Sequence, residues 1–147
     1  MHLIWSLNGI GKTKTVSVIL HMLLKAPSKR RILVCAPTNT ALVQLTSHLV
    51  SLVEKSTGAN PSLVDIILFG SDKLMKKIDK DLSQILLKDR VEGIPGKHKI
   101  MSTQKRENFC LRDAKFVFCI PCKSSRLRNQ QYNVLVIDEA ANLKECD

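Results

Sequence analysis

Short apolar runs alternate with amphipathic helical patterns along this chain, and this alternation constrains the fold more than any other feature. Residues 32–36 form a continuous apolar run, which is typical of a strand buried on both faces. Residues 12–25 place apolar side chains at helical spacing, and Pro27 excludes a longer helix. The order strand, helix, strand, helix predicts an α/β fold in which helices flank a parallel sheet.

The same reasoning assigns elements elsewhere in the chain. We expect further strands at residues 2–6, 64–69, 115–120 and 134–137. Thr40 is expected to cap a second helix, whose apolar side lies between Leu42 and Leu52. The last strand, at residues 134–137, is apolar throughout and suits a central position in a parallel sheet.

The middle of the chain holds one more helical pattern and one basic segment. Apolar residues align from residue 71 or 72 to about Gly93, which predicts a single long helix. Residues 93–108 contain glycine, proline and several basic residues without periodicity, and we interpret them as a basic loop or a junction. Residues 124–131 are polar and are expected to form a short helix or a turn.

The composition is that of a globular protein. The length of 147 residues suggests one domain, and an apolar content of 44% excludes a generally disordered chain. No apolar run approaches the roughly 20 residues that a transmembrane helix needs. Residues 1–7 are too short for a signal peptide and lack a basic leader. We therefore expect an intracellular protein, nuclear or cytoplasmic, with no membrane partner.

The chain is strongly basic, with a formal net charge of +10 at pH 7. An excess of this size favours partners with phosphate backbones, such as RNA or DNA. The alternatives are an ordinary solvated surface, or a fragment separated from acidic neighbours, and composition alone does not decide between them.

A glycine-rich loop lies between the strand expected at residues 2–6 and the helix expected at residues 12–25. The loop and the helix start consist of Gly9, Ile10, Gly11, Lys12, Thr13 and Lys14. Backbone N–H groups at such a turn, together with the positive end of the helix, form a trap for phosphate groups. In the P-loop pattern, the lysine (here Lys12) reaches the β and γ phosphates and the hydroxyl (here Thr13) coordinates Mg²⁺.

This loop departs from the full P-loop pattern at its first position. Ser6 stands where the pattern has glycine, and serine would cost roughly 1–3 kcal/mol if that position requires a strained dihedral. A chance Gly-Lys-Thr sequence is the alternative interpretation, and the strand–loop–helix context favours the phosphate loop.

A pair of carboxylates follows the last predicted strand. Asp138 and Glu139 come directly after residues 134–137, and strand ends of this kind face the ligand crevice of an open α/β sheet. Asp138 is expected to hold Mg²⁺, and Glu139 is expected to orient and deprotonate an attacking water. The alternative is that both residues simply lie at the start of a helix beginning at Ala140.

Three segments together resemble superfamily 1 helicases. GIGKTKTVSVIL resembles their motif I, ILVCAPTNTALVQL their motif Ia, and VLVIDEAANLKE their motif II. The combination is similar to the nonsense-mediated-decay helicase and senataxin branch, especially to its large plant helicase-like proteins. DIILFGSDKLMKKIDKDL and DRVEGI also resemble the stretch that those plant proteins carry between motifs Ia and II. The resemblance implies a partial RecA-like P-loop NTPase domain over residues 1–147, with a family-like insertion at residues 57–113.

The resemblance also implies roles for individual residues. Lys12 and Glu139 would be catalytic, and Thr13 and Asp138 would hold Mg²⁺ beside ATP. Three consecutive residues would contact the backbone of single-stranded RNA or DNA, namely Pro37, Thr38 and Asn39. The family motif that corresponds to FCIPCKSSRL usually has threonine near Ile120, so that nucleic-acid contact is not expected here.

The resemblance covers motifs I, Ia and II, and motifs III to VI are not in the sequence. We therefore expect an incomplete domain without the second RecA-like domain that supplies arginine fingers. Such fingers contribute about 10³–10⁵ in rate in related enzymes, so hydrolysis by this chain would be slow and unwinding would not occur. The alternatives are a non-catalytic basic module that binds nucleic acid, or a degenerate helicase remnant, and whether the chain is an enzyme stays open.

Overall fold

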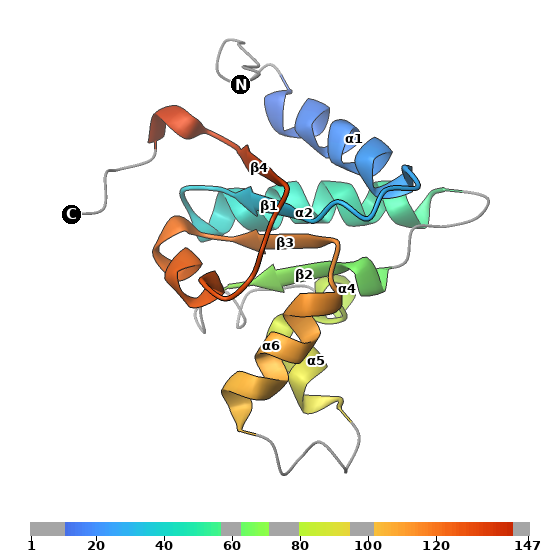
Figure 1. Ribbon diagram of the computed structural model, residues 1–147. Coiled ribbons are helices and arrows are strands. Elements are labelled where there is room, and N and C mark those ends of the chain that lie inside the picture. The colour runs from blue at the N-terminus through green and yellow to red at the C-terminus, as the bar shows by residue number, and fades with distance from the viewer. Residues whose placement is uncertain (1–10, 57–62, 71–79, 95–101, 143–147) are drawn as a thin grey trace.

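The computed structural model describes residues 11–56, 63–70, 80–94 and 102–142. These residues form a four-stranded sheet with helices on both faces (Figure 1). The strands are β1 (Ile32–Cys35), β2 (Ile66–Phe69), β3 (Phe116–Cys119) and β4 (Val134–Ile137), in the order β2-β3-β1-β4. Every strand pair is parallel, which confirms the predicted α/β class and is consistent with a P-loop NTPase-like domain.

The helices of the described residues differ widely in length. The α-helices are α1 (Lys12–Lys25), α2 (Asn39–Glu54), α4 (Lys80–Ser83), α5 (Leu87–Glu92) and α6 (Thr103–Asp113). The 3₁₀-helices are η1 (Leu63–Asp65), η3 (Pro121–Leu127) and η4 (Ala140–Asn142). Within this described part of the chain, no helix has the length and apolar character needed to cross a membrane.

The sheet separates two hydrophobic clusters. One cluster joins the buried apolar side chains of α1 and α2 to alternate strand residues, including Val34 and Phe118. The other joins α5, α6 and η3 to the remaining strand residues, including Val117 and Cys119. Because successive side chains of a strand point to opposite faces, strands that are apolar throughout fill both clusters. The continuous apolar runs were therefore a correct sign of a sheet covered on both sides.

Strand β4 differs from the other strands in its exposure. It pairs with β1, and among the described residues it has no second neighbour, so it lies at the edge of this sheet. Val134 and Val136 pack against the cluster under α1, whereas Leu135 and Ile137 are 58% and 41% exposed. The central position expected for residues 134–137 is therefore not observed. The strand expected at residues 2–6 lies outside the described residues.

Two of the predicted helices have different boundaries in the structure. The second helix begins at Asn39, and its cap is Thr38, whose side chain accepts a hydrogen bond from the amide of Ala41. Thr40 was therefore the wrong cap. The single helix expected up to Gly93 is also wrong over the described residues, because α4 and α5 are separate. The chain between them extends beside β2, where the amide of Leu68 donates to the carbonyl of Ile85.

Helix α6 occupies a segment in which we expected a loop. It spans Thr103–Asp113, and the Ser102 side chain accepts a hydrogen bond from the amide of Lys105 at its start. Leu111 is its only residue that is fully buried. A helix with so little apolar surface carries no periodic signal, and for this reason residues 103–108 were not recognised as helical.

Candidate functional site

Thr13 and Asp138 lie in contact at the carboxyl-terminal ends of the strands. The Thr13 hydroxyl donates a hydrogen bond of 3.5 Å to Oδ2 of Asp138, although 125 positions separate the two residues in sequence. Thr13 lies in the first turn of α1, and Asp138 directly follows β4. The fold thus brings together one residue from each end of the chain, the two that the sequence proposed as Mg²⁺ ligands.

The start of α1 has the geometry of an anion site. Gly11 precedes the helix with φ of +71°, a left-handed conformation that favours glycine. Among the residues that the structure describes, no side chain caps this end, and the first turn contains no acidic residue. The amide groups of the first turn and the positive end of the helix dipole are therefore directed toward the space before Gly11. Gly9, Ile10 and Ser6 lie outside the described residues.

Asp138 is buried, and hydrogen bonds to three residues hold it in place. The side chain is 4% exposed, and the Asp138 amide donates a 2.9 Å hydrogen bond to the carbonyl of Cys35 in β1. Burial raises the pKa of the Asp138 carboxyl, and the negative charge of Glu139 raises it further. Hydrogen bonds from the Glu139 amide and the Thr13 hydroxyl act in the opposite direction, as does the positive charge of Lys12. A cation beside this carboxylate would therefore relieve an unfavourable charge.

Glu139 has the one left-handed backbone conformation found at a non-glycine residue of the described chain. Its φ is +53°, and its amide donates a 3.1 Å hydrogen bond to Oδ1 of Asp138. The side chain is exposed, and its Oε2 accepts a 3.4 Å hydrogen bond from the amide group of Asn142. A strained backbone at such a position costs on the order of 1 kcal/mol, and strain of this kind is concentrated at functional sites.

The three residues proposed to contact nucleic acid lie at the same edge of the sheet, just after β1. Thr38 already accepts the amide of Ala41 as the cap of α2, at 3.1 Å, which is the structural alternative for this residue. Thr38 is exposed, and Pro37 and Asn39 are half-buried. They share with Asp138 the end of the sheet at which the strands finish.

Ser17 supports the site and was not identified from the sequence. Its buried hydroxyl lies 2.7 Å from the carbonyl of Thr13, to which it donates, and 3.4 Å from the carbonyl of Leu45 in α2. The hydrogen bond to Thr13 lies within α1, and the approach to the Leu45 carbonyl places this part of the helix against α2. The signal was a small polar residue on the apolar face of the helix, four positions after Thr13.

The donor atoms at this site suit Mg²⁺, although no metal or nucleotide is part of the structure. A threonine hydroxyl and a carboxylate are hard oxygen ligands of the kind that Mg²⁺ prefers. No cluster of three or more His, Cys, Asp or Glu side chains occurs within the described residues. Such a cluster is not needed, since Mg²⁺ in nucleotide sites usually relies on one or two protein ligands, substrate phosphates and water.

Residues 1–113 match the family model described as AAA domain. The match includes Lys12 and Thr13 and ends before Asp138 and Glu139. This domain is found in superfamily 1 helicases, and P-loop domains of the AAA type generally use ATP and Mg²⁺. No curated protein matches the sequence. Because the match spans most of its length, the chain belongs to the AAA domain family of ATPase-like and helicase-like modules.

Proposed function

We propose that this chain is the ATP-binding and ATP-hydrolysing part of a superfamily 1 helicase-like protein. The observation that carries the proposal is the 3.5 Å approach of the Thr13 hydroxyl to the Asp138 carboxylate. Helix capping alone is a weaker explanation of Asp138. One carboxylate oxygen of Asp138 accepts from the Thr13 hydroxyl and the other accepts from the amide of the next residue, whereas a capping side chain accepts from the second or third helical residue.

The proposed binding step uses the start of α1. Backbone amides of the first turn and the Lys12 ammonium bind the β and γ phosphates of ATP. Thr13 and Asp138 hold Mg²⁺, which neutralises charge on those phosphates when it is bound. Lys12 is close enough for its charge to lower the pKa of Asp138, which supports their acting in one site.

The proposed hydrolytic step uses Glu139. Its carboxylate is exposed and follows Asp138 directly, so it can reach a water molecule on the solvent side of the bound phosphates. Glu139 accepts a proton from that water as the water oxygen attacks the γ phosphorus, and ADP leaves. Its contact with Asn142 orients the carboxylate.

Binding of a fluorescent ATP analogue in the presence of Mg²⁺ tests the proposal. We expect Lys12→Ala to weaken binding at least tenfold, because the phosphates lose a direct charge contact. Glu139→Gln should retain binding and reduce phosphate release by about 10²–10⁴-fold, the usual contribution of a general base. Lys29→Ala, which removes an exposed lysine far along the chain from the loop, is the matched control. Equal binding by wild type and Lys12→Ala would show that the loop does not bind ATP.

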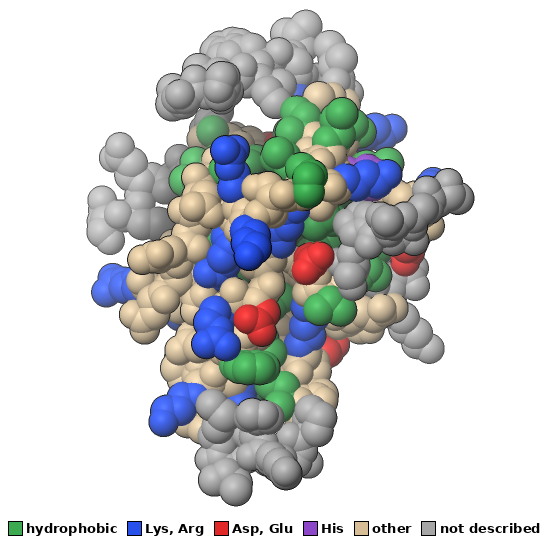
Figure 2. Space-filling view, turned by 45° about the vertical axis from the view of Figure 1, so that its right-hand side comes forward, with side chains coloured by type: hydrophobic (Ala, Val, Ile, Leu, Met, Phe, Trp, Pro, Cys, Tyr) green, Lys and Arg blue, Asp and Glu red, His purple; other side chains and the backbone are tan. Residues whose placement is uncertain are grey.

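We further propose single-stranded RNA or DNA as the partner at Pro37, Thr38 and Asn39. The net charge of +10 supports this partner, and Lys and Arg side chains outnumber Asp and Glu on the face drawn in Figure 2. Hydroxyl and amide groups at a strand end contact phosphates without reading sequence. Affinity for a labelled oligonucleotide should fall steeply as salt rises, and Asn39→Ala should weaken it. Affinity that does not change with salt would contradict the proposed partner.

A further inference from the structure

A polar pocket lies at the opposite end of the sheet from Thr13 and Asp138, where the strands begin. It has a volume of about 500 Å³ and is open to solvent. Its walls are α6 on one side and residues 129–131, just before β4, on the other. None of the described residues that line it is acidic, and three of them are cationic, Arg31, Lys105 and Arg112.

Helix α6 presents one continuous face to this pocket. Lys105, Asn108, Phe109 and Arg112 all line it, and their spacing of three, four and seven residues places them on one side of the helix. Phe109 is 41% exposed and contributes nothing to the buried clusters. The Arg112 guanidinium lies 5.8 Å from the centre of the Phe109 ring. The face therefore combines an aromatic ring, with the Arg112 guanidinium over it, and a second cation at Lys105, four residues earlier along the helix.

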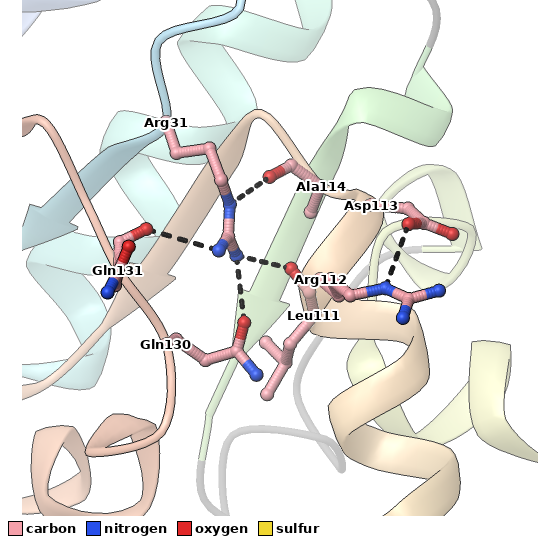
Figure 3. Close-up of polar contacts among 7 residues, drawn as sticks. All are labelled: Arg31, Leu111, Arg112, Asp113, Ala114, Gln130 and Gln131. Atoms are coloured by element: carbon pink, nitrogen blue, oxygen red, sulfur yellow. Dashed lines mark hydrogen bonds and ion pairs between the residues drawn. The ribbon is translucent and has the colours of Figure 1, made fainter.

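Arg31 provides the rigid floor of the pocket. As Figure 3 shows, its guanidinium donates to the carbonyls of Leu111, Ala114 and Gln131 and to the side-chain oxygen of Gln130, over distances of 2.6–3.2 Å. It also lies 4.9 Å from the centre of the Tyr132 ring. All four acceptors are neutral oxygens, so these hydrogen bonds fix the position of the guanidinium and leave its positive charge uncompensated by a carboxylate.

The nearest acidic group does little to offset the charge of this pocket. Oδ1 of Asp113 lies 3.6 Å from Nε of Arg112, and both side chains are about 70% exposed (71% and 67%). An ion pair so exposed to water is weak and is screened by salt. The pocket therefore attracts anionic ligands, and its amide side chains add hydrogen-bonding groups.

We propose that this pocket binds a nucleotide unit of a single-stranded nucleic acid, with its base on Phe109 and its flanking phosphates at Lys105 and Arg112. Aromatic rings bind bases of any sequence by stacking, and cations beside the ring track the backbone. Lys105 and Arg112 are seven residues apart, about 10 Å along the helix. That separation favours a strand with a phosphate on each side of the base over a mononucleotide with one phosphate.

This pocket is separate from the contact proposed at residues 37–39. The β-strands have four residues each, so the two ends of the sheet are about 13 Å apart along the strands. A nucleic-acid strand bound at Phe109 therefore lies at the opposite end of the sheet from a nucleic-acid strand bound at Thr38. The proposal rests on the nucleic-acid partner proposed above, and it does not require an intact ATP site.

Fluorescence anisotropy with a labelled strand of uridines, and with the thymidine counterpart, tests the pocket. Lys105→Ala/Arg112→Ala should weaken binding at least tenfold at low salt. It should also reduce the slope of log affinity against log salt by about 1.4, because two contacts are lost at about 0.7 each. Phe109→Leu should weaken binding about tenfold with little change of slope, since stacking rather than charge is lost. The double variant Lys25→Ala/Lys29→Ala removes the same charge elsewhere and should change the affinity less than threefold.

Each outcome separates this pocket from the other proposed sites. Unchanged strand binding by the Phe109 and Lys105/Arg112 variants, with binding by wild type, would overturn this proposal alone. No strand binding by wild type would overturn the proposed partner as well, while the ATP analogue still tests the loop. Displacement of the labelled strand by adenosine monophosphate at equal concentration would assign the pocket to free nucleotides. It would overturn the proposal that the pocket binds a single-stranded nucleic acid. Photo-crosslinking of a thiouridine strand should modify a peptide within residues 102–113, and circular dichroism checks that each variant remains folded.

Discussion

The two ends of the parallel strands carry polar clusters of opposite charge, an acidic cluster where the strands end and a basic cluster where they begin. At the edge where the strands end, a buried carboxylate faces a hydroxyl, and burial together with Glu139 raises the pKa of Asp138. At the edge where the strands begin, the Arg31 guanidinium donates four hydrogen bonds to neutral oxygens. The first cluster is under electrostatic strain that a bound cation would relieve, whereas the second is satisfied within the chain. We therefore expect the Arg31 side chain to stabilise the fold and the charged Asp138 carboxylate to weaken it.

Arg31→Ala should produce the largest loss of stability. It leaves the carbonyl of Ala114 without its described partner and removes one of the two donors to the carbonyl of Leu111, which keeps only the amide of Ala114. It also detaches the end of α6 from the start of β1. We expect the free energy of unfolding to fall by about 3 kcal/mol, measured by urea denaturation. Arg30→Ala, at the exposed neighbouring position, should change it by no more than about 0.5 kcal/mol. Similar losses from both variants would mean that the Arg31 cluster does not hold the fold.

Asp138→Asn should raise the free energy of unfolding, whereas Arg31→Ala should lower it. Because the pKa of Asp138 is raised in the folded state, the folded chain binds a proton more tightly than the unfolded chain. The free energy of unfolding of wild type should therefore fall as the pH rises from the ordinary aspartate range through the raised pKa, and stay level above it. The variant lacks this fall and should be more stable at pH 7 by on the order of 1 kcal/mol.

The same variant should lose the Mg²⁺ dependence of nucleotide binding, because a neutral amide replaces the proposed ligand. Thermal denaturation across a pH series measures the first effect, and analogue binding with and without Mg²⁺ measures the second. A less stable Asp138→Asn protein would show that the carboxylate contributes to the fold, and the contrast between the two edges would then be wrong.

Glu139→Gly should give the smallest change. Glycine adopts a φ of +53° without strain, but it also loses more entropy on folding, so the net gain should be about 0.5 kcal/mol. Glu139→Ala is the control, since it removes the same carboxylate and keeps the strain. If glycine and alanine give equal unfolding free energies, the backbone at this position is not strained. Both variants should lose phosphate release.

The sequence predicted the elements that carry strong apolar patterns. Helix α1 has the predicted bounds, Lys12–Lys25, because Gly11 and Pro27 limit it on both sides. Strand β4 was located correctly for the same reason, and among the described residues it has one neighbouring strand, β1. An apolar run locates a strand in the sequence. It does not show which neighbouring elements cover its side chains, and Leu135 and Ile137 are partly exposed here.

The sequence was least informative where tertiary contacts determine the structure. The helical pattern up to Gly93 continues through Ile85, yet the Ile85 carbonyl accepts the amide of Leu68, and the backbone is extended at Leu86 before α5 begins. In the site, the pairing of Thr13 with Asp138 was accessible because both residues belong to motifs. The left-handed backbone of Glu139, the contacts of the Ser17 hydroxyl and the Phe109 face of α6 are tertiary or backbone features, and they required the structure.

The hydrogen bond from the Asp138 amide to the carbonyl of Cys35 connects the proposed nucleotide site to the backbone that leads to Thr38, the proposed contact with nucleic acid. Three residues after Cys35 the chain reaches Thr38, so a shift of the segment between them also moves the group that anchors Asp138. If a strand bound at Thr38 produces such a shift, the affinity for nucleotide must change. Reciprocity then requires that nucleotide change the affinity for the strand by the same factor, so β1 would serve as the thermodynamic link between the two ligands.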